Sequence, residues 1–205
     1  MSESLAAGAN LGSRSLHAAP IELIQRCLEG EERAYLAVYN EYAAMIFRLC
    51  FSILGHEQDA EEVMQDTFEY AFRKLSRYDA RRASFKTWLY QIAISRCRNK
   101  RRRKVLPTFP LGNVRDEQLP DHKTPRPAER AILSEQQLVV WQALEKLSTK
   151  LREVAVLRYY EELTYAEIGN VLSIPPKTAE SRMRLAHKQL REHLMNSPRW
   201  TGRTP

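Results

Sequence analysis

Two stretches of opposite charge hold the residues most suited to binding chemistry. Residues 59–69 read DAEEVMQDTFE and carry five acidic side chains and no basic one. Residues 96–104 read RCRNKRRRK and are almost wholly basic. A dense basic surface attracts nucleic acid or another polyanion, whereas an acidic surface repels one. The two stretches therefore indicate two different partners.

The basic region is wider than this run and contains interleaved aromatic rings. Between Arg73 and Lys104, thirteen Lys and Arg stand against one acid, Asp79, which gives a local net charge of +12. Such surfaces are typical of proteins that bind single strands, because aromatic rings stack on unpaired bases. Two simpler interpretations stay open: an apolar helical stripe favours a core position for Trp88, and RNKRRRK can be a solvated helix end. The interleaved rings are Tyr78, Phe85, Trp88 and Tyr90.

The acidic side chains recur at helical spacing. Intervals of three, four and three residues place four of them on one face of a helix, opposite its apolar stripe. A solvated face is the usual explanation, but like charges one turn apart cost a helix a few tenths of a kcal/mol per pair, roughly. We therefore expect these acids to point outward and to meet a basic surface on a protein partner. They are Asp59, Glu62, Asp66 and Glu69.

A second candidate nucleic-acid site lies near the C-terminus. Thr164 and Glu167 form a T-x-x-E capping box at the start of one short helix, and Pro176 begins a longer helix after a tight turn. This pattern is typical of a helix-turn-helix, which places its second helix in the DNA major groove. An ordinary helical hairpin with a solvated basic face is the alternative. The expected DNA contacts are Lys177, Thr178, Ser181, Arg182, Arg184 and Lys188.

Helical periodicity predicts the elements that position both sites. Apolar residues recur every three or four positions through residues 21–103 and again through 132–195, with few competing strand signals. Residues 104–131 carry five prolines and too few apolar side chains for a core, which indicates a linker. Residues 1–20 and 196–205 are interpreted as tails. We expect an all-α fold of two small helical domains joined by a flexible linker.

Composition and motif content narrow the class of protein. The net charge is +7, and no signal-peptide pattern or long apolar stretch occurs, so we expect a cytoplasmic protein with no membrane span. The three cysteines lie beside apolar stripes without C-x-x-C spacing, which favours buried free thiols. No set of side chains has metal-ligand spacing, and no phosphate-binding or nucleophile motif occurs. We therefore expect no metal, no cofactor and no enzymatic activity.

Several segments resemble a known family. DAEEVMQDTFEYAFRKL, followed by FKTWLYQIA and RRR, resembles region 2 of bacterial RNA polymerase sigma factors, and residues 151–194 resemble region 4. The two-domain layout is similar to that of the extracytoplasmic-function (ECF) group, and the resemblance covers about residues 21–103 and 134–195. Gly169 and Ser173 depart from the Ala and Gly that the family often has around the turn. We expect the turn to differ locally, because Ser in a left-handed conformation costs about 1 kcal/mol.

The resemblance implies a role for each candidate surface. The acidic helix would dock on the clamp coiled coil of the polymerase β′ subunit through Asp59, Glu62, Gln65 and Asp66. The loop before FKTWL would bind a flipped base of the −10 element, and the helix that follows would face the non-template strand. The last helix would recognise the −35 element through the six residues given above. The implied −10 contacts are Arg77, Tyr78, Arg81, Arg82, Ser84, Lys86, Thr87, Tyr90, Gln91, Arg98, Arg101 and Arg102.

The implied function is that of an ECF sigma factor. Such a chain would bind core RNA polymerase through the β′ clamp and β flap and direct initiation at promoter DNA, with an anti-sigma factor as a further candidate partner. Opening a duplex costs about 1.4 kcal/mol per base-pair step, which cationic and aromatic surface can offset by holding the unpaired strand. The alternative is a helix-turn-helix regulator that is not a polymerase subunit. That alternative leaves the acidic face without a role.

Overall fold

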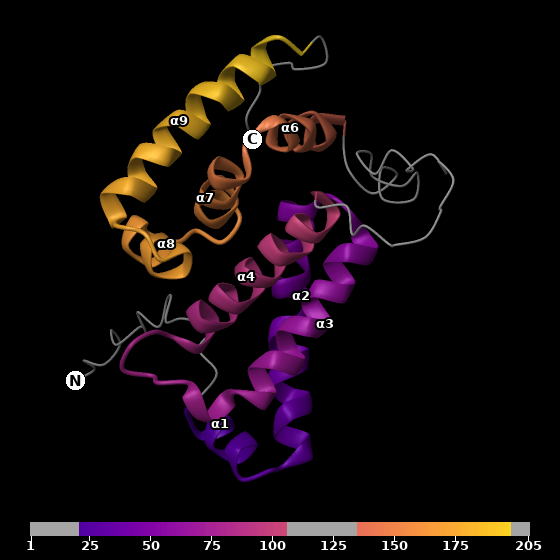
Figure 1. Ribbon diagram of the computed structural model, residues 1–205, viewed down its shortest axis with the longest axis vertical. Helices are drawn as coiled ribbons and strands as arrows, with labels where there is room; N and C mark the ends of the chain where they lie inside the picture. Colours follow the sequence, from indigo (N-terminus) through magenta and orange to yellow (C-terminus); the bar gives the residue numbers. More distant parts are fainter. Residues whose placement is uncertain (1–20, 106–134, 198–205) are drawn as a thin grey trace, which may run out of the picture.

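The computed structural model describes residues 21–105 and 135–197, and every regular element in those ranges is helical (Figure 1). The prediction of an all-α fold with two helical domains is therefore confirmed. The predicted tails and linker lie outside the described residues, except that one helix continues to Val105 and residues 196–197 are placed. The elements are α1 (Ile21–Leu28), α2 (Glu32–Leu54), α3 (Glu57–Arg73), η1 (Leu75–Arg77), α4 (Phe85–Val105), α6 (Glu135–Lys146), α7 (Thr149–Tyr159), α8 (Tyr165–Leu172) and α9 (Pro176–Met195).

The N-terminal bundle, defined here as α1–α4, is organised around α2. This helix packs on α1, α3 and α4 and buries apolar side chains such as Ile46 and Leu49. Gly55 ends α2 in the left-handed conformation (φ 74°), and its N–H donates to the Phe51 carbonyl at 2.9 Å. Glycine adopts this conformation at no steric cost, so the chain can turn directly into α3.

The three cysteines are buried free thiols, as predicted: Cys27, Cys50 and Cys97.

The C-terminal bundle, defined here as α6–α9, contains the predicted helix-turn-helix in α8 and α9. The capping box at the start of α8 is present. The Thr164 hydroxyl accepts a hydrogen bond from the Glu167 N–H at 3.3 Å, and the Glu167 carboxylate accepts one from the Thr164 N–H at 2.8 Å. These two bonds satisfy backbone donors that the first helical turn leaves without partners. Pro176 begins α9, as predicted from its missing N–H.

The turn between α8 and α9 depends on an unusual pair of residues. Ser173 ends α8 with a left-handed backbone (φ 56°), which a side chain beyond glycine adopts at a cost. At Gly169, in contrast, only glycine fits, because an added Cβ would lie only 2.7 Å from the Ile174 backbone oxygen. The Ile174 N–H donates to the Gly169 carbonyl at 3.0 Å, which closes the turn. The glycine therefore lets the start of α9 approach α8 closely.

The two bundles pack directly on each other. Helix α8 lies against α4 and α7 lies against α2, and Figure 1 shows α7 and α8 beside the N-terminal bundle. Buried apolar residues of both bundles form one continuous core. The rings of Phe51 in α2 and Trp141 in α6 stack with centroids 4.8 Å apart. The C-terminal bundle consequently covers part of the α4 surface.

Candidate nucleic-acid and protein interfaces

The loop between η1 and α4 is exposed but held in one conformation by its own side chains. The Tyr78 hydroxyl donates to the Ala83 carbonyl at 3.2 Å. The Asp79 carboxylate accepts from the Arg81 N–H and from the Arg81 guanidinium, each at 3.0 Å. These hydrogen bonds from Arg81 lower the pKa of Asp79. A loop ordered in advance loses less conformational freedom when it binds a nucleotide. The predicted contact residues exposed here are Arg77, Arg81, Arg82 and Ser84.

Aromatic packing fixes the loop to the start of α4. The Tyr78 ring lies 5.3 Å from the Phe85 ring and 5.4 Å from the Trp88 ring, measured between centroids. Phe85 is buried in the core, whereas Trp88 is only half-buried. The ring of Trp88 therefore packs on the core, as its apolar stripe indicated, and also keeps one part of its surface accessible.

Thr87 requires a correction of its predicted contact with the −10 strand. Its side chain is 7% exposed. Its N–H donates to the Ser84 hydroxyl oxygen at 3.1 Å, and the two hydroxyl oxygens lie 2.9 Å apart. Thr87 thus completes the first turn of α4, and the hydroxyl that was expected to face DNA is occupied within the protein.

Three further predicted −10 residues contact the C-terminal bundle. Tyr90 is fully buried, and its hydroxyl donates to the Glu161 carboxylate. Burial, followed by this neighbouring carboxylate, raises the pKa of Tyr90. The Lys86 ammonium lies 4.0 Å from the same carboxylate. The Gln91 amide donates to the Asn170 carbonyl at 2.9 Å. The sequence of α4 alone could not predict that the C-terminal bundle packs on this face of the helix.

The basic end of α4 is divided between inner and outer positions. Arg98 forms two hydrogen bonds with the Glu153 carboxylate of α7, at 2.8 and 2.7 Å. Arg101 donates to the Ile53 carbonyl at the end of α2, at 3.3 Å. Arg102 remains exposed. Of the predicted −10 contacts on this half of α4, Arg102 alone faces solvent without a cross-bundle or inter-helix contact among the described residues.

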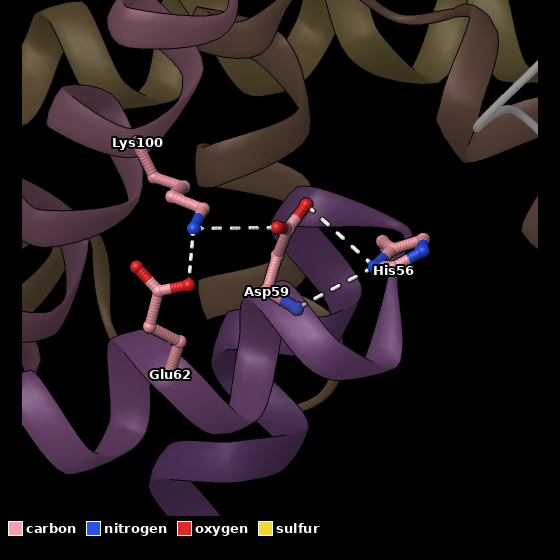
Figure 2. A network of polar contacts seen from close by, with 4 residues as sticks. All are labelled: His56, Asp59, Glu62 and Lys100. Carbon is pink, nitrogen blue, oxygen red and sulfur yellow. Dashed lines mark hydrogen bonds and ion pairs between the residues drawn. The ribbon is translucent and has the colours of Figure 1, made fainter. Parts of the chain in front are cut away.

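The acidic face of α3 is only partly as predicted. Asp59 is 8% exposed, and its carboxylate lies 3.5 Å from the Lys100 ammonium and 3.7 Å from His56 Nδ1 (Figure 2). The prediction that Asp59 points outward is therefore wrong, because α4 packs over the first turn of α3 and brings Lys100 onto it. Glu62 also contacts Lys100 but stays exposed, as do Gln65 and Asp66. The accessible acidic face is the outer side of α3 from Glu62 onward.

Lys100 itself is held by these carboxylates. Burial lowers the pKa of Lys100, but the hydrogen bond to Glu62 and the charges of Glu62 and Asp59 outweigh this effect and raise it overall. The ammonium therefore stays charged within the bundle. One cation of the basic stretch is consequently used inside the protein and is not offered to an external polyanion.

Helix α9 has most of its predicted contact residues exposed to solvent. Lys177, Ser181, Arg184 and Lys188 are exposed, and Thr178 and Arg182 are half-buried. A shallow groove of about 530 Å³ follows this face. Ala179, Met183 and Ala186 are buried on the opposite side of the helix. The α9 face can therefore contact a DNA groove while its other side holds the bundle together.

Sequence reasoning missed two hollows. One is a cleft of about 420 Å³ between α3 and α4, in which the Arg96 guanidinium lies 4.6 Å above the Tyr70 ring. The other is a mostly apolar groove of about 680 Å³ formed by α6, α7 and α9. Two adjacent tyrosines in the sequence, Tyr159 and Tyr160, could have indicated the groove; in the structure both are more than half exposed. The cleft is lined by Tyr70, Trp88, Gln91, Ile92, Ser95, Arg96 and Asn99. The groove is lined by Val140, Leu144, Ala155, Tyr159, Tyr160, His187, Leu190, Arg191, Leu194 and Met195.

Residues 21–105 and 135–197 contain no group of three or more His, Cys, Asp or Glu side chains placed to hold a metal ion. In the same ranges no helix has the length and apolar character needed to cross a membrane.

Comparison with known proteins places these surfaces in a family context. The sequence matches the Sigma-70 region 2 family over residues 38–105 and the Sigma-70, region 4 family over residues 137–190. The ECF RNA polymerase sigma factor SigW of Bacillus subtilis is 32% identical, and the match covers 83% of this chain and 94% of SigW. The RNA polymerase sigma-H factor of Pseudomonas aeruginosa is 30% identical, with coverage of 79% and 86%.

Solved structures show the same fold. CnrH, solved in complex with the cytosolic domain of CnrY, aligns with a TM-score of 0.64 and 25% identity, over 86% of this chain and 97% of CnrH. RpoE of Bartonella quintana, solved in complex with the anti-sigma factor NepR, aligns with a TM-score of 0.58 over 80% of this chain and 98% of RpoE. Its 17% identity supports the likeness of fold only.

Proposed function

Because this chain belongs to the ECF group of RNA polymerase sigma factors, which direct promoter-specific transcription initiation, we propose how its surface is divided between polymerase and promoter. Residues 21–103 act as region 2 and residues 132–195 as region 4, with 104–131 as the linker. Phosphodiester chemistry belongs to the polymerase, and this chain contributes binding and DNA opening. A regulator that is not a polymerase subunit is not favoured, because region 2 is present as well as the helix-turn-helix.

The outer face of α3 is the proposed contact with the β′ clamp. Glu62, Gln65 and Asp66 are exposed there, on a helix whose other side is packed into the bundle. Carboxylates on an exposed helix attract a basic partner surface and set its orientation. Asp59 contributes indirectly, because it fixes Lys100 and with it the packing of α4 on α3. The same acids would repel promoter DNA, so this side of region 2 would bind a protein partner and not DNA.

The loop of residues 77–84 and the α3–α4 cleft are the proposed surface for the melted −10 strand. Arg77, Arg81 and Arg82 lie exposed on the loop, where they can contact phosphates. The accessible part of Trp88 and the Arg96–Tyr70 pair supply ring and guanidinium planes on which unpaired bases can stack. Together these groups would offset part of the cost of unpairing, about 1.4 kcal/mol per step.

The C-terminal bundle supplies two further proposed contacts. The exposed face of α9 recognises the −35 element, with Lys177, Arg182 and Arg184 suited to phosphates and guanine edges. The apolar groove of α6, α7 and α9 fits a protein element with an apolar face, and the β flap is the proposed occupant. An anti-sigma factor is a further proposed partner; CnrH, which is 25% identical to this chain, was solved in complex with another protein, the cytosolic domain of CnrY.

One observation carries the proposal: a single chain has matches to both sigma regions in order, and the surfaces they occupy differ in charge as polymerase and promoter require. The test is size-exclusion chromatography of the chain with core RNA polymerase, followed by run-off transcription. Co-elution with promoter-dependent transcripts is expected. A chain that binds promoter DNA but neither co-elutes with polymerase nor supports transcription would overturn the proposal.

A further inference from the structure

Leu185 is an apolar side chain on the exposed side of α9 that none of the contacts described above uses. The residue is 48% exposed and lines the shallow groove of about 530 Å³ on this helix. Most of the accessible lining of this groove is apolar, although the residues around it are largely polar or cationic. The other lining residues are Pro175, Lys177, Thr178, Ser181 and Arg182.

Packing within the bundle does not explain a leucine at this position. The buried side of α9 is formed by Ala179, Met183 and Ala186, each at most 1% exposed. Among the described residues, Leu185 belongs neither to the core nor to the partly buried side chains that pack against it. Its apolar surface therefore stays in contact with water, and covering that surface with a partner is favourable.

The polar groups around Leu185 favour DNA as that partner. Lys177 and Arg182 line the groove, and Lys188 is exposed one helical turn beyond it. These cations attract phosphates, so a duplex is the partner that brings apolar groups onto Leu185. The Ser181 hydroxyl donates to the Lys177 carbonyl of its own helix at 2.9 Å, so its hydrogen is not offered to a base. The middle of the groove consequently suits an apolar contact better than a hydrogen-bond donor.

Thymine is the base whose major-groove edge matches a leucine. It carries a C5 methyl group there, whereas guanine, adenine and cytosine present hydrogen-bonding groups. A leucine has no donor or acceptor, so it would leave those groups without water and without a partner, which is costly. Contact with the methyl group instead removes apolar surface of both partners from water.

We propose that Leu185 is a specificity-determining residue that selects a thymine of the −35 element through its C5 methyl group. The inference rests on the proposed −35 role of α9 and adds a base that the helix recognises without a hydrogen bond. Leu185 follows Arg182 by three residues, which is about 4.5 Å along the helix axis. Successive base pairs are about 3.4 Å apart, so we expect the thymine within about two base pairs of the guanine that Arg182 suits.

The test starts from duplexes that the full chain selects together with core RNA polymerase. Duplexes retained from a randomised pool are sequenced, and the upstream enriched segment gives the −35 element. Each thymine of this segment, on either strand, is then replaced singly by deoxyuridine, which lacks only the C5 methyl group. At one thymine we expect binding of the wild type to weaken about fourfold, the effect of taking one methyl group out of apolar contact. Replacement at the other thymines should leave the affinity unchanged.

Two variants assign the effect to Leu185. Leu185→Ala should bind the thymine and the uracil duplex equally, because the apolar partner of the methyl group is removed. Leu36→Ala is the matched control, since Leu36 is 59% exposed on α2 in the other bundle, and it should keep the full preference for thymine. Both variants should melt as the wild type does, because both leucines are exposed. The uracil comparison on the wild-type chain needs no variant at all.

Several outcomes would overturn the assignment of Leu185. They are a −35 segment without thymine, equal wild-type affinity for thymine and uracil at every position, a uracil effect that persists in Leu185→Ala, and loss of the preference in Leu36→Ala. Failure of the chain and core polymerase to enrich any sequence over polymerase alone would instead reject the proposed function itself.

Discussion

The Lys100 ammonium lies 3.5 Å from the Asp59 carboxylate, so the basic stretch of α4 and the acidic stretch of α3 meet inside the N-terminal bundle (Figure 2). Charge is compensated where the two helices pack. On their outer sides Asp66 of α3 and Arg102 of α4 are exposed. The same pair of helices can therefore have an acidic protein-binding side and a basic DNA-binding side.

Asp59 should contribute to stability and not to polymerase contact. Asp59→Asn removes a charged partner of Lys100 in a poorly exposed position and should lower the free energy of unfolding by about 1–3 kcal/mol. Urea denaturation followed by circular dichroism measures it. Asp66→Asn, on the exposed side of the same helix, should stay within about 0.5 kcal/mol of wild type. Equal effects at the two positions would contradict the assignment.

Asp66→Arg should weaken binding to core polymerase without unfolding the chain. Reversing an exposed charge that faces a basic partner changes attraction into repulsion, and a loss of about tenfold in affinity is expected. Size-exclusion chromatography with polymerase gives the readout, and thermal melting checks the fold. Glu192→Arg makes the same charge change on α9 and should bind as wild type does; equal weakening by both would indicate a general charge effect.

The turn of the helix-turn-helix should respond in opposite ways at its two unusual residues. Gly169→Ala places a Cβ about where the Ile174 oxygen requires space, so it should destabilise the chain by about 1–3 kcal/mol. Ser173→Gly relieves the left-handed backbone and should be neutral or stabilising by up to about 1 kcal/mol. Thermal unfolding of the two variants distinguishes these signs. A Gly169→Ala variant as stable as wild type would show that the turn can relax.

The capping box should give a measurable pH dependence. Hydrogen bonds from the Thr164 side chain, then from its backbone, hold the pKa of Glu167 below its ordinary value of 4.5. The stabilisation from ionised Glu167 is therefore fully present above pH 4.5 and is lost as pH falls through the lowered folded-state pKa. The stability advantage of wild type over Glu167→Gln should shrink in that window. An advantage that is constant with pH would mean that the carboxylate charge is not involved.

Lys188 and Arg182 should differ in how they affect binding to −35 DNA. Lys188 is exposed on α9 and suits a phosphate, so Lys188→Ala should weaken all duplexes similarly and reduce the slope of log affinity against log salt by about 1. Arg182 borders the groove and suits a base edge, so Arg182→Ala should cost about 1–3 kcal/mol and relax specificity. Titrations of a promoter duplex and a scrambled duplex at several salt concentrations separate the two. A salt slope of the Lys188→Ala variant identical to that of wild type would contradict the phosphate role of Lys188.

The sequence predicted the local elements because their determinants are local. The apolar periodicity in the region of α2 and the T-x-x-E box of α8 each act within a few residues, and each occurs as predicted. Gln65 and Asp66 are exposed for the same reason, since the wheel of α3 alone decides which side they occupy.

The misses arise where two distant elements meet. Asp59 shares a helical face with Asp66, but α4 packs over the first turn of α3, where Asp59 lies. The periodicity of the α3 sequence carries no information about this packing. The contacts of Tyr90 with Glu161 and of Arg98 with Glu153 join residues 71 and 55 positions apart. The resemblance of the chain to the family implied that Thr87 contacts DNA. In the structure the Thr87 hydroxyl is already paired with the Ser84 hydroxyl.

The central claim is that this chain directs core RNA polymerase to promoters. Run-off transcription with purified core polymerase on fragments of the source genome, with and without the chain, tests it most directly. We predict discrete transcripts that require the chain, that weaken for Asp66→Arg and that disappear when the −10 or −35 segment of the template is scrambled. Transcription that is unchanged by adding the chain, in the presence of demonstrated binding to duplex DNA, would contradict the account.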